Sequence, residues 1–191
     1  MFDDGWDLQW FLDRAKGREN TFRHIAQICE QSRCKTVLDV GGGVGVLRRF
    51  LPMDIKHDVV DLSPNAKLYG ESLFPDVRFT TGQIDDVDRT YDAIVGIQLV
   101  EHMREYESFL RSAWNKAGKI VVITFRNGLD ETEKIKLHKG CGDYWDNKYS
   151  LPGLENWINK ELQSVIVNLS KVKVDRDYSP EIVLAFHKES A

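Results

Sequence analysis

The sequence predicts an α/β protein whose sheet is doubly wound, mostly parallel and open. Three observations support this. Apolar segments of the 191-residue chain alternate between strand-like and helix-like periods. A short apolar run at 36–40 ends in glycines. Two strand-like segments at 165–174 and 182–187 are joined by a turn, as in an antiparallel hairpin. Five strand–helix steps followed by a hairpin imply three layers with right-handed crossovers.

The individual elements follow from local patterns. Strands are expected where short apolar runs occur, at 36–40, 57–62, 77–81, 91–97 and 119–125. Helical spacing, caps and prolines place helices at 18–31, 44–51, from Ser63-Pro64 onwards, at 103–114 and at 152–162. Trp6 and Trp10, four residues apart, are expected to share a helix face. Residues 127–150 are polar, aromatic and glycine-bearing, so we expect an inserted lid or loop there.

We therefore expect one domain over residues 1–191. Its parts are an N-terminal helical cap (1–35), a core (36–126), the inserted lid with its helix (127–162) and a C-terminal hairpin (163–191). A chain of this length is enough for one hydrophobic core and short for two.

Composition narrows the classes of function. Apolar residues make up 42% and charged residues 29% of the chain, and the net charge is −4, which argues against a nucleic-acid partner. No apolar run is long enough to span a membrane, and the start of the chain lacks the layout of a signal peptide. Cys29, Cys34 and Cys141 have no metal-ligand spacing and are expected to be reduced, non-catalytic thiols. These features predict a cytoplasmic protein.

The most informative segment is Val37-Leu38-Asp39-Val40-Gly41-Gly42-Gly43-Val44-Gly45. A buried strand ends here, glycines form a tight turn and a helix begins. Such a turn lets backbone approach a ligand closely, and it lies at the sheet edge where ligands bind. A dinucleotide fingerprint needs a third glycine at the position of Val46, so a nicotinamide-dependent dehydrogenase is disfavoured.

The pattern resembles instead the first motif of class I S-adenosylmethionine-dependent methyltransferases, which have a Rossmann-like sheet of strand order 3-2-1-4-5-7-6. The resemblance covers about Thr36 to Phe125. It implies that S-adenosylmethionine is the cofactor. The residues expected to bind it include Asp39 and the turn residues Gly41, Gly42, Gly43 and Gly45, and Gln98 is expected beside its methionyl tail. Asp39 would orient the turn and the ammonium group.

The resemblance also identifies the adenosine side of the site. Asp61, followed by Leu62, ends the second strand, where an acid can accept hydrogen bonds from both ribose hydroxyls. An alternative role for Asp61 is that of an acid favoured by the dipole of the following helix. Gln83 stands where many family members have an acid near the adenine amino group. Asp85 is the alternative partner for that group, and Ile84 is expected to pack on the adenine face.

Catalytic residues are harder to identify from the sequence, because methyl transfer needs mainly alignment of the acceptor with the methyl group and exclusion of water. His102 is the leading candidate for a general base, and a histidine that braces the loop is the alternative. His138, Asp143 and Tyr144 in the inserted segment are further candidates. Aromatic residues of that segment either form the acceptor pocket or pin the segment to the sheet. Gln98 replaces the leading acid of a metal-binding arrangement that some relatives complete with Glu101 and His102, so no metal is expected.

The function expected from these features is methylation of a hydroxyl or amine of a small molecule by a monomer or weak homodimer. The sequence lacks the Asn/Asp-Pro-Pro-Tyr/Phe signature of methylases that act on exocyclic or amide nitrogens and the Pro-Cys pair of cytosine-C5 methylases. Methylation of a protein or RNA, and a catalytically silent cofactor-binding scaffold, are the alternatives.

Overall fold

A computed structural model describes residues 6–126, 133–138, 143–148, 151–162, 165–173 and 181–188 of the chain. Seven of its strands form one sheet of order β3-β2-β1-β4-β5-β9-β8, which is the predicted order 3-2-1-4-5-7-6 once the strands of the main sheet are counted alone. β1 to β5 are parallel, and β9 runs antiparallel to both β5 and β8. The strands are β1 (Thr36–Val40), β2 (Lys56–Asp61), β3 (Arg78–Thr81), β4 (Tyr91–Ile97), β5 (Ala117–Arg126), β8 (Val165–Val172) and β9 (Glu181–Lys188).

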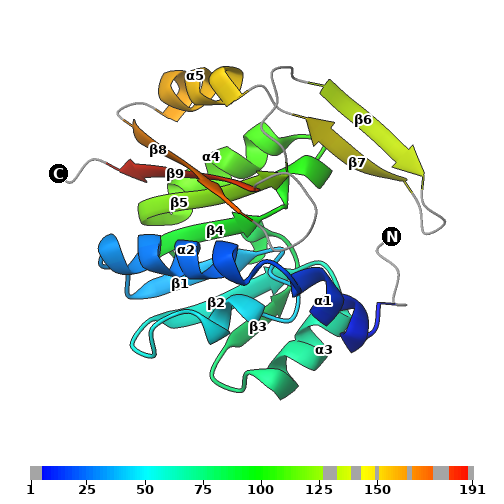
Figure 1. Ribbon diagram of the computed structural model, residues 1–191. Coiled ribbons are helices and arrows are strands. Elements are labelled where there is room, and N and C mark those ends of the chain that lie inside the picture. The colour runs from blue at the N-terminus through cyan, green and yellow to red at the C-terminus, as the bar shows by residue number, and fades with distance from the viewer. Residues whose placement is uncertain are drawn as a thin grey trace.

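Helices cover both faces of the sheet (Figure 1). They are α1 (Leu8–Ala15), α2 (Glu19–Gln31), α3 (Pro64–Leu73), α4 (Tyr106–Lys116) and α5 (Leu151–Leu162), with short 3-10 turns η1 (Val46–Arg49), η2 (Ile84–Asp86) and η3 (Val100–His102). Because side chains alternate along a strand, β1 sends Val37 to the α2 face and Leu38 to the α4 face. Each face therefore has its own hydrophobic core.

The N-terminal helix packs at the edge of the sheet where the parallel strands end. Asp7 caps α1 by accepting the N–H of Trp10. Trp6 lies before the first residue of α1, yet its ring stacks on Trp10 with centroids 4.2 Å apart. Phe11 on the same helix is buried with Val44 and Ala66. The shared aromatic face predicted from spacing is thus present, although only Trp10 is inside the helix.

Some boundaries differ from those predicted. The helix expected at 44–51 is only the short 3-10 turn η1. Gly45 adopts a left-handed φ of 78° just before η1, so helical backbone begins only at Val46. The helix expected from Met103 begins at Tyr106, since residues 100–102 form η3 instead. The inserted segment contains a two-stranded antiparallel hairpin of β6 (Glu133–His138) and β7 (Asp143–Lys148). The sequence pattern of these two strands is too weak to predict them, because each is only six residues long and contains several charged residues.

Candidate functional site

The glycine turn lies between β1 and η1, at the point where the strand order reverses between β1 and β4. Gly43 has a left-handed φ of 56°, which residues with a side chain rarely adopt. Gly42 is needed for a different reason: a Cβ there would lie 2.6 Å from the carboxyl carbon of Asp39. The turn is therefore built so that its backbone lies directly over an acidic side chain.

Asp61 at the end of β2 holds this turn in place. Its Oδ2 accepts the N–H of Gly43 at 2.9 Å, and its Oδ1 accepts the N–H of Ser63 at 2.8 Å. Burial raises the pKa of the Asp61 carboxyl, the two N–H groups oppose that shift, and the negative charge of Asp39 adds to it. Each carboxylate oxygen has a second lone pair, so Asp61 retains the capacity to accept further donors. The bond to Ser63 agrees with the helix-start role considered above, and the bond to Gly43 adds a role in shaping the turn.

Asp39 lies beneath the turn and is buried, with 2% of its surface exposed. Its Oδ2 is 3.8 Å from Nε2 of the equally buried His57 on β2. Oδ1 of Asp39 and both ring nitrogens of His57 have no hydrogen-bond partner among the described residues. A buried carboxylate is costly without compensation. A positively charged group next to the turn would supply that compensation.

The end of β4 lies next to the glycine turn. The side chain of Leu99 lies against Gly41, since a Cβ on that glycine would be 2.8 Å from Leu99 Cδ1. Gln98 adopts a left-handed φ of 48°, an uncommon conformation for a residue with a side chain. Its N–H donates to Oγ1 of Thr124 at 3.1 Å, and its side-chain oxygen accepts a hydrogen bond from the guanidinium of Arg18. Arg18 is the residue immediately before α2.

A buried polar chain supports the end of β4 from behind. The Thr124 hydroxyl on β5 donates to Oε1 of Glu181 on β9 at 2.9 Å, and the Thr21 hydroxyl on α2 donates to Oε2 at 2.5 Å. All three side chains are at most 1% exposed. This chain joins α2, β9, β5 and β4, so it fixes both Arg18 and Gln98 relative to the sheet.

The predicted adenine side lies past β3. Gln83 caps η2, and its N–H donates to Oδ2 of Asp86 at 2.8 Å. Ile84 is buried in the α4-side core, whereas Asp85 is exposed. Leu62, beside Asp61, is 41% exposed and offers an apolar surface at the end of β2. The contacts of these four residues with an adenine ring stay predictions.

The hairpin of β6 and β7 is attached to η3, after β4. The amide nitrogen of Asn147 donates to the carbonyls of Val100, at 3.3 Å, and of Met103. The ring of His102 is exposed, and its Nδ1 lies 2.9 Å from the carbonyl oxygen of Trp145. This contact is of the kind expected for a bracing histidine. His138 is the last residue of β6 and Tyr144 lies in β7, but their side chains lie outside the described residues.

No group of three or more potential metal ligands occurs in the described part of the chain. Within the same residues, no helix is both long and apolar enough to cross a membrane. Cys29 and Cys34 are buried and reduced, and a hydrogen bond with Cys34 together with burial raises the pKa of the Cys29 thiol. Cys141 lies outside the described residues.

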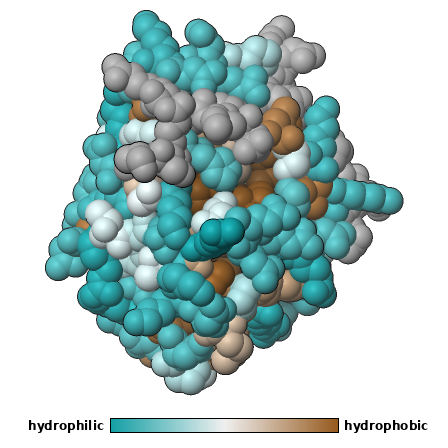
Figure 2. Space-filling view, turned by 90° about the vertical axis from the view of Figure 1, so that its left-hand side faces the viewer, coloured by the Kyte–Doolittle hydropathy of each residue, from teal (hydrophilic) through white to brown (hydrophobic). Residues whose placement is uncertain are grey.

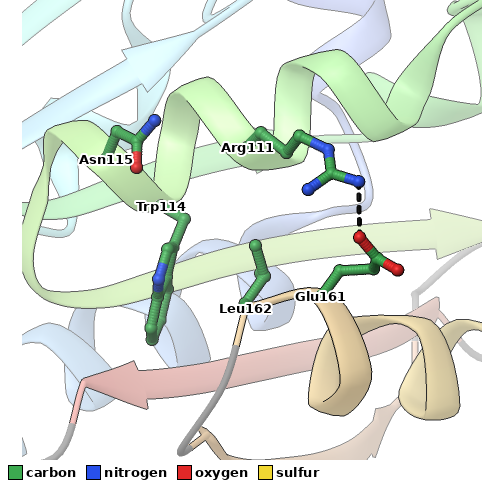
Figure 3. A pocket seen from close by; sticks show the side chains of 5 residues that line it. All are labelled: Arg111, Trp114, Asn115, Glu161 and Leu162. Atoms are coloured by element: carbon green, nitrogen blue, oxygen red, sulfur yellow. Dashed lines mark hydrogen bonds and ion pairs between the residues drawn. The ribbon is translucent and has the colours of Figure 1, made fainter.

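A separate hollow of about 290 Å³ lies between the last turns of α4 and α5 (Figure 3). Its walls are Trp114, Asn115, Leu162 and the ion pair of Arg111 with Glu161, whose atoms are 2.7 Å apart. The end of α4 leads directly into β5, so the hollow lies where the parallel strands begin, opposite the glycine turn. The face on that side is mainly hydrophilic, with hydrophobic residues gathered near its middle (Figure 2).

The structure thus brings together the predicted residues Asp39, Asp61, Gln98 and the four glycines. It also shows three residues that no sequence motif marks: Arg18, His57 and Glu181. Strand alternation gave a signal for His57, because it shares a face of β2 with Asp61. No local pattern marks Arg18 or Glu181, whose contacts span 80 and 160 residues of sequence.

No family model matches the sequence, and no curated protein resembles it closely enough to count as a match. Solved structures do resemble the fold. The methyltransferase domain of bacterial CtHen1-C aligns with a TM-score of 0.70 at 16% identity, covering 92% of this chain and all of that one. A Burkholderia thailandensis 1,6-didemethyltoxoflavin-N1-methyltransferase, with bound substrate and S-adenosylhomocysteine, gives 0.71 at 16%, covering 94% and 81% of the two chains.

A third similar structure is CalS10, an amino pentose methyltransferase from Micromonospora echinaspora with S-adenosylmethionine bound. It aligns with a TM-score of 0.66 at 12% identity, covering 95% of this chain and 98% of that one. At these identities the likeness establishes the fold. The predicted fold class is therefore confirmed on the strand order and on these alignments together.

Proposed function

We propose that this protein, which has the fold of class I S-adenosylmethionine-dependent methyltransferases, transfers a methyl group from that cofactor to a hydroxyl or amine of a small molecule. The observation that carries the proposal is the glycine turn at the switch point of the sheet, held by Asp61 over the buried carboxylate of Asp39. A glycine turn alone would be weak support. Its coincidence with an acid at the end of β2 and with this strand order is much more specific.

The residues present fit the cofactor. The buried Asp39, with one oxygen lacking a partner among the described residues, provides negative potential for the ammonium group. Asp61 has acceptor capacity left for ribose hydroxyls, and the exposed Leu62 provides apolar surface beside it. Gln83, Ile84 and Asp85 are the candidates for the adenine side. When bound, the cofactor supplies a methyl carbon activated by its sulfonium.

The chain's own contribution is alignment and exclusion of water. An acceptor hydroxyl or amine that receives the methyl group also has to give up a proton, so a basic side chain near the end of β4 would assist the transfer. His102 lies after β4 and is the candidate to take that proton, with His138 and Tyr144 as further candidates in the hairpin. The alternative role of His102 as a brace is supported by its contact with the Trp145 carbonyl.

A small-molecule acceptor is supported by two similar structures, whose acceptors are a toxoflavin precursor and an amino pentose. The net charge of −4 supports the same choice over a nucleic acid. We infer a cytoplasmic protein that is monomeric or a weak homodimer. A screen of small-molecule hydroxyls and amines as acceptors identifies the group that is methylated.

The test is calorimetric titration with S-adenosylmethionine, S-adenosylhomocysteine and NAD, beside an Asp61→Ala variant. We expect micromolar binding of the first two ligands and a loss of one to two orders of magnitude in the variant, because hydrogen bonds to a charged group contribute roughly 1.5–3 kcal/mol each. Binding of NAD alone would contradict the proposal. Cofactor binding without turnover on any acceptor would favour the silent scaffold.

A further inference from the structure

We infer that Asp39 and His57 form a proton-dependent ion pair beneath the glycine turn, so that the protonation of His57 sets the net charge under the turn. The inference rests on the proposed function, because it concerns the regulation of that same site. Histidine is the side chain that ordinarily gains or loses its charge between pH 5 and 8. Binding of a positively charged group at the turn should therefore depend on pH near neutrality.

The strand register places the two side chains on one face of the sheet. β1 and β2 are parallel, and Val37 lies level with His57. Val37 packs in the core under α2, and side chains alternate along a strand, so Asp39 and His57 also point to the α2 face. Oδ2 of Asp39 is 3.8 Å from Nε2 of His57, and each residue is 2% exposed. The two groups are thus buried neighbours.

The burial of this pair leaves hydrogen-bonding capacity unused. Oδ1 of Asp39 and both ring nitrogens of His57 have no hydrogen-bond partner among the described residues. A buried charge needs a partner, so a neutral His57 leaves the Asp39 carboxylate uncompensated. A proton on His57 supplies the missing positive charge. Burial by itself disfavours a charged imidazole, so this proton is retained only because the carboxylate is present.

Arg48 on η1 is a second buried cation in this region, but it is committed to another carboxylate. Its Nε donates to Oδ2 of Asp76 at 2.7 Å. The pKa of the Asp76 carboxyl is lowered mainly by this hydrogen bond, and charge on His57 contributes to the same shift. On the strand of His57 itself, Lys56 and Asp58 point to the opposite face, where Asp58 accepts the hydroxyl of Tyr91.

The remaining titratable groups that interact with Asp39 are acids. A hydrogen bond with Cys34 and burial raise the pKa of the Cys29 thiol on α2, and the negative charge of Asp39 adds to this shift. Burial raises the pKa of the Asp61 carboxyl, and the charge of Asp39 adds to that shift as well. Neither Cys29 nor Asp61 can supply a positive charge. His57 is therefore the group that compensates Asp39 from below.

The first experiment compares Asp39→Asn with wild type by urea denaturation of the full chain, at about pH 8 and about pH 5.5. At the lower pH the unfolded chain takes up a proton on His57, whereas the folded variant, without the carboxylate, excludes it. The unfolding equilibrium constant of Asp39→Asn relative to wild type should therefore rise about tenfold between the two pH values. Adding His57→Gln to Asp39→Asn should remove this rise.

Two other histidines serve as references. Burial lowers the pKa of His187, which reduces stability at low pH in every variant alike and cancels in the comparison with wild type. His24→Gln in the Asp39→Asn background is the matched control, because Nε2 of His24 lies 2.7 Å from the hydroxyl of Ser170 rather than beside a carboxylate. This control should keep the tenfold rise.

The second experiment measures the calorimetric affinities of S-adenosylhomocysteine and of 5′-methylthioadenosine, which lacks the amino-acid end, at the same two pH values. In wild type, the affinity for S-adenosylhomocysteine relative to 5′-methylthioadenosine should fall about 3- to 10-fold at the lower pH, because a charged His57 competes with the ligand's ammonium group for Asp39. In His57→Gln this ratio should stay constant.

Equal pH profiles for the stability of Asp39→Asn and wild type overturn the inference and leave the proposed function standing. A rise that persists after His57→Gln is added overturns it equally. If Asp39→Asn does not fold, an unchanged ligand ratio in wild type is the overturning result. If wild type binds neither ligand, the proposed function fails, and the stability comparison still decides the inference.

Discussion

At the ends of β1 and β2 the polar contacts join residues close in sequence, whereas at the ends of β4, β5 and β9 they join residues far apart. Asp61 holds Gly43 across 18 residues and uses backbone N–H groups. Glu181 holds Thr124 across 57 residues and Thr21 across 160, and it uses side-chain hydroxyls. The half of the site at the ends of β1 and β2 is thus specified by a local motif. The half at the ends of β4, β5 and β9 depends on the completed fold.

This difference has an energetic side. Asp61 is only partly buried, so removing it exposes its donors to water at modest cost. Glu181 is sealed inside the protein, so its partners cannot turn to water. The half that includes Asp61, proposed to contact the cofactor, should therefore tolerate substitution with little loss of stability. The half that supports it should not.

The largest effect is expected for Glu181→Ala. It leaves two buried hydroxyls without an acceptor, each costing about 1–3 kcal/mol, so the free energy of unfolding should fall by roughly 2–5 kcal/mol. Urea denaturation followed by circular dichroism measures this. Asp61→Asn is the comparison and should lower the free energy of unfolding by less than about 1 kcal/mol. Equal losses in the two variants would remove the distinction between the two halves.

A smaller effect is expected for Asn147→Ala, which detaches the hairpin from η3. The carbonyls of Val100 and Met103 each lose the hydrogen bond from Asn147, so local opening should become about 1–2 kcal/mol easier. Hydrogen exchange of the amides in 133–138 and 143–148 measures it, with little change in β1 or β2. The control is Asn115→Ala, an exposed asparagine on the opposite side of the molecule. Unchanged exchange in the Asn147 variant would show that other contacts hold the hairpin.

The smallest effect concerns pH. Burial raises the pKa of the Asp61 carboxyl above its ordinary value of about 3.9, so it takes up a proton at higher pH than an exposed aspartate does. A protonated carboxyl is a poorer acceptor for ribose hydroxyls. Affinity for 5′-methylthioadenosine should therefore fall several-fold as the pH drops, before exposed carboxylates titrate. Asp61→Asn should bind more weakly and show no such fall.

The raised pKa of Asp61 changes stability in the opposite direction to affinity as the pH falls. A carboxyl whose pKa is raised on folding binds its proton more readily in the folded state, so its contribution to stability increases as the pH falls through that range. A loss of affinity with an unchanged or higher melting temperature therefore assigns the effect to Asp61. A parallel loss of both would point to unfolding.

The sequence predicted most of the fold and only half of the site. The limits of β1 and β4 match those predicted, because short apolar runs bounded by glycine or polar residues are unambiguous. Asp39, Asp61 and the glycines were found because a tight turn needs particular residue types at fixed spacing. Arg18 and Glu181 were not found, because their roles come from long-range contacts that leave no local pattern. The hairpin of β6 and β7 was missed since charged residues obscure its alternation.

The place of β9 has a consequence for how the chain is made. This strand comes after β8 in the sequence but lies between β5 and β8 in the sheet. During synthesis, β5 therefore keeps an unpaired apolar edge until residues 181–188 have left the ribosome, and such edges promote aggregation. Glu181 arrives with the same strand, so the end of β4 reaches its final conformation only at that moment. A nascent chain shorter than this should therefore form the glycine turn and its contact with Asp61 before the segment at Gln98 is fixed.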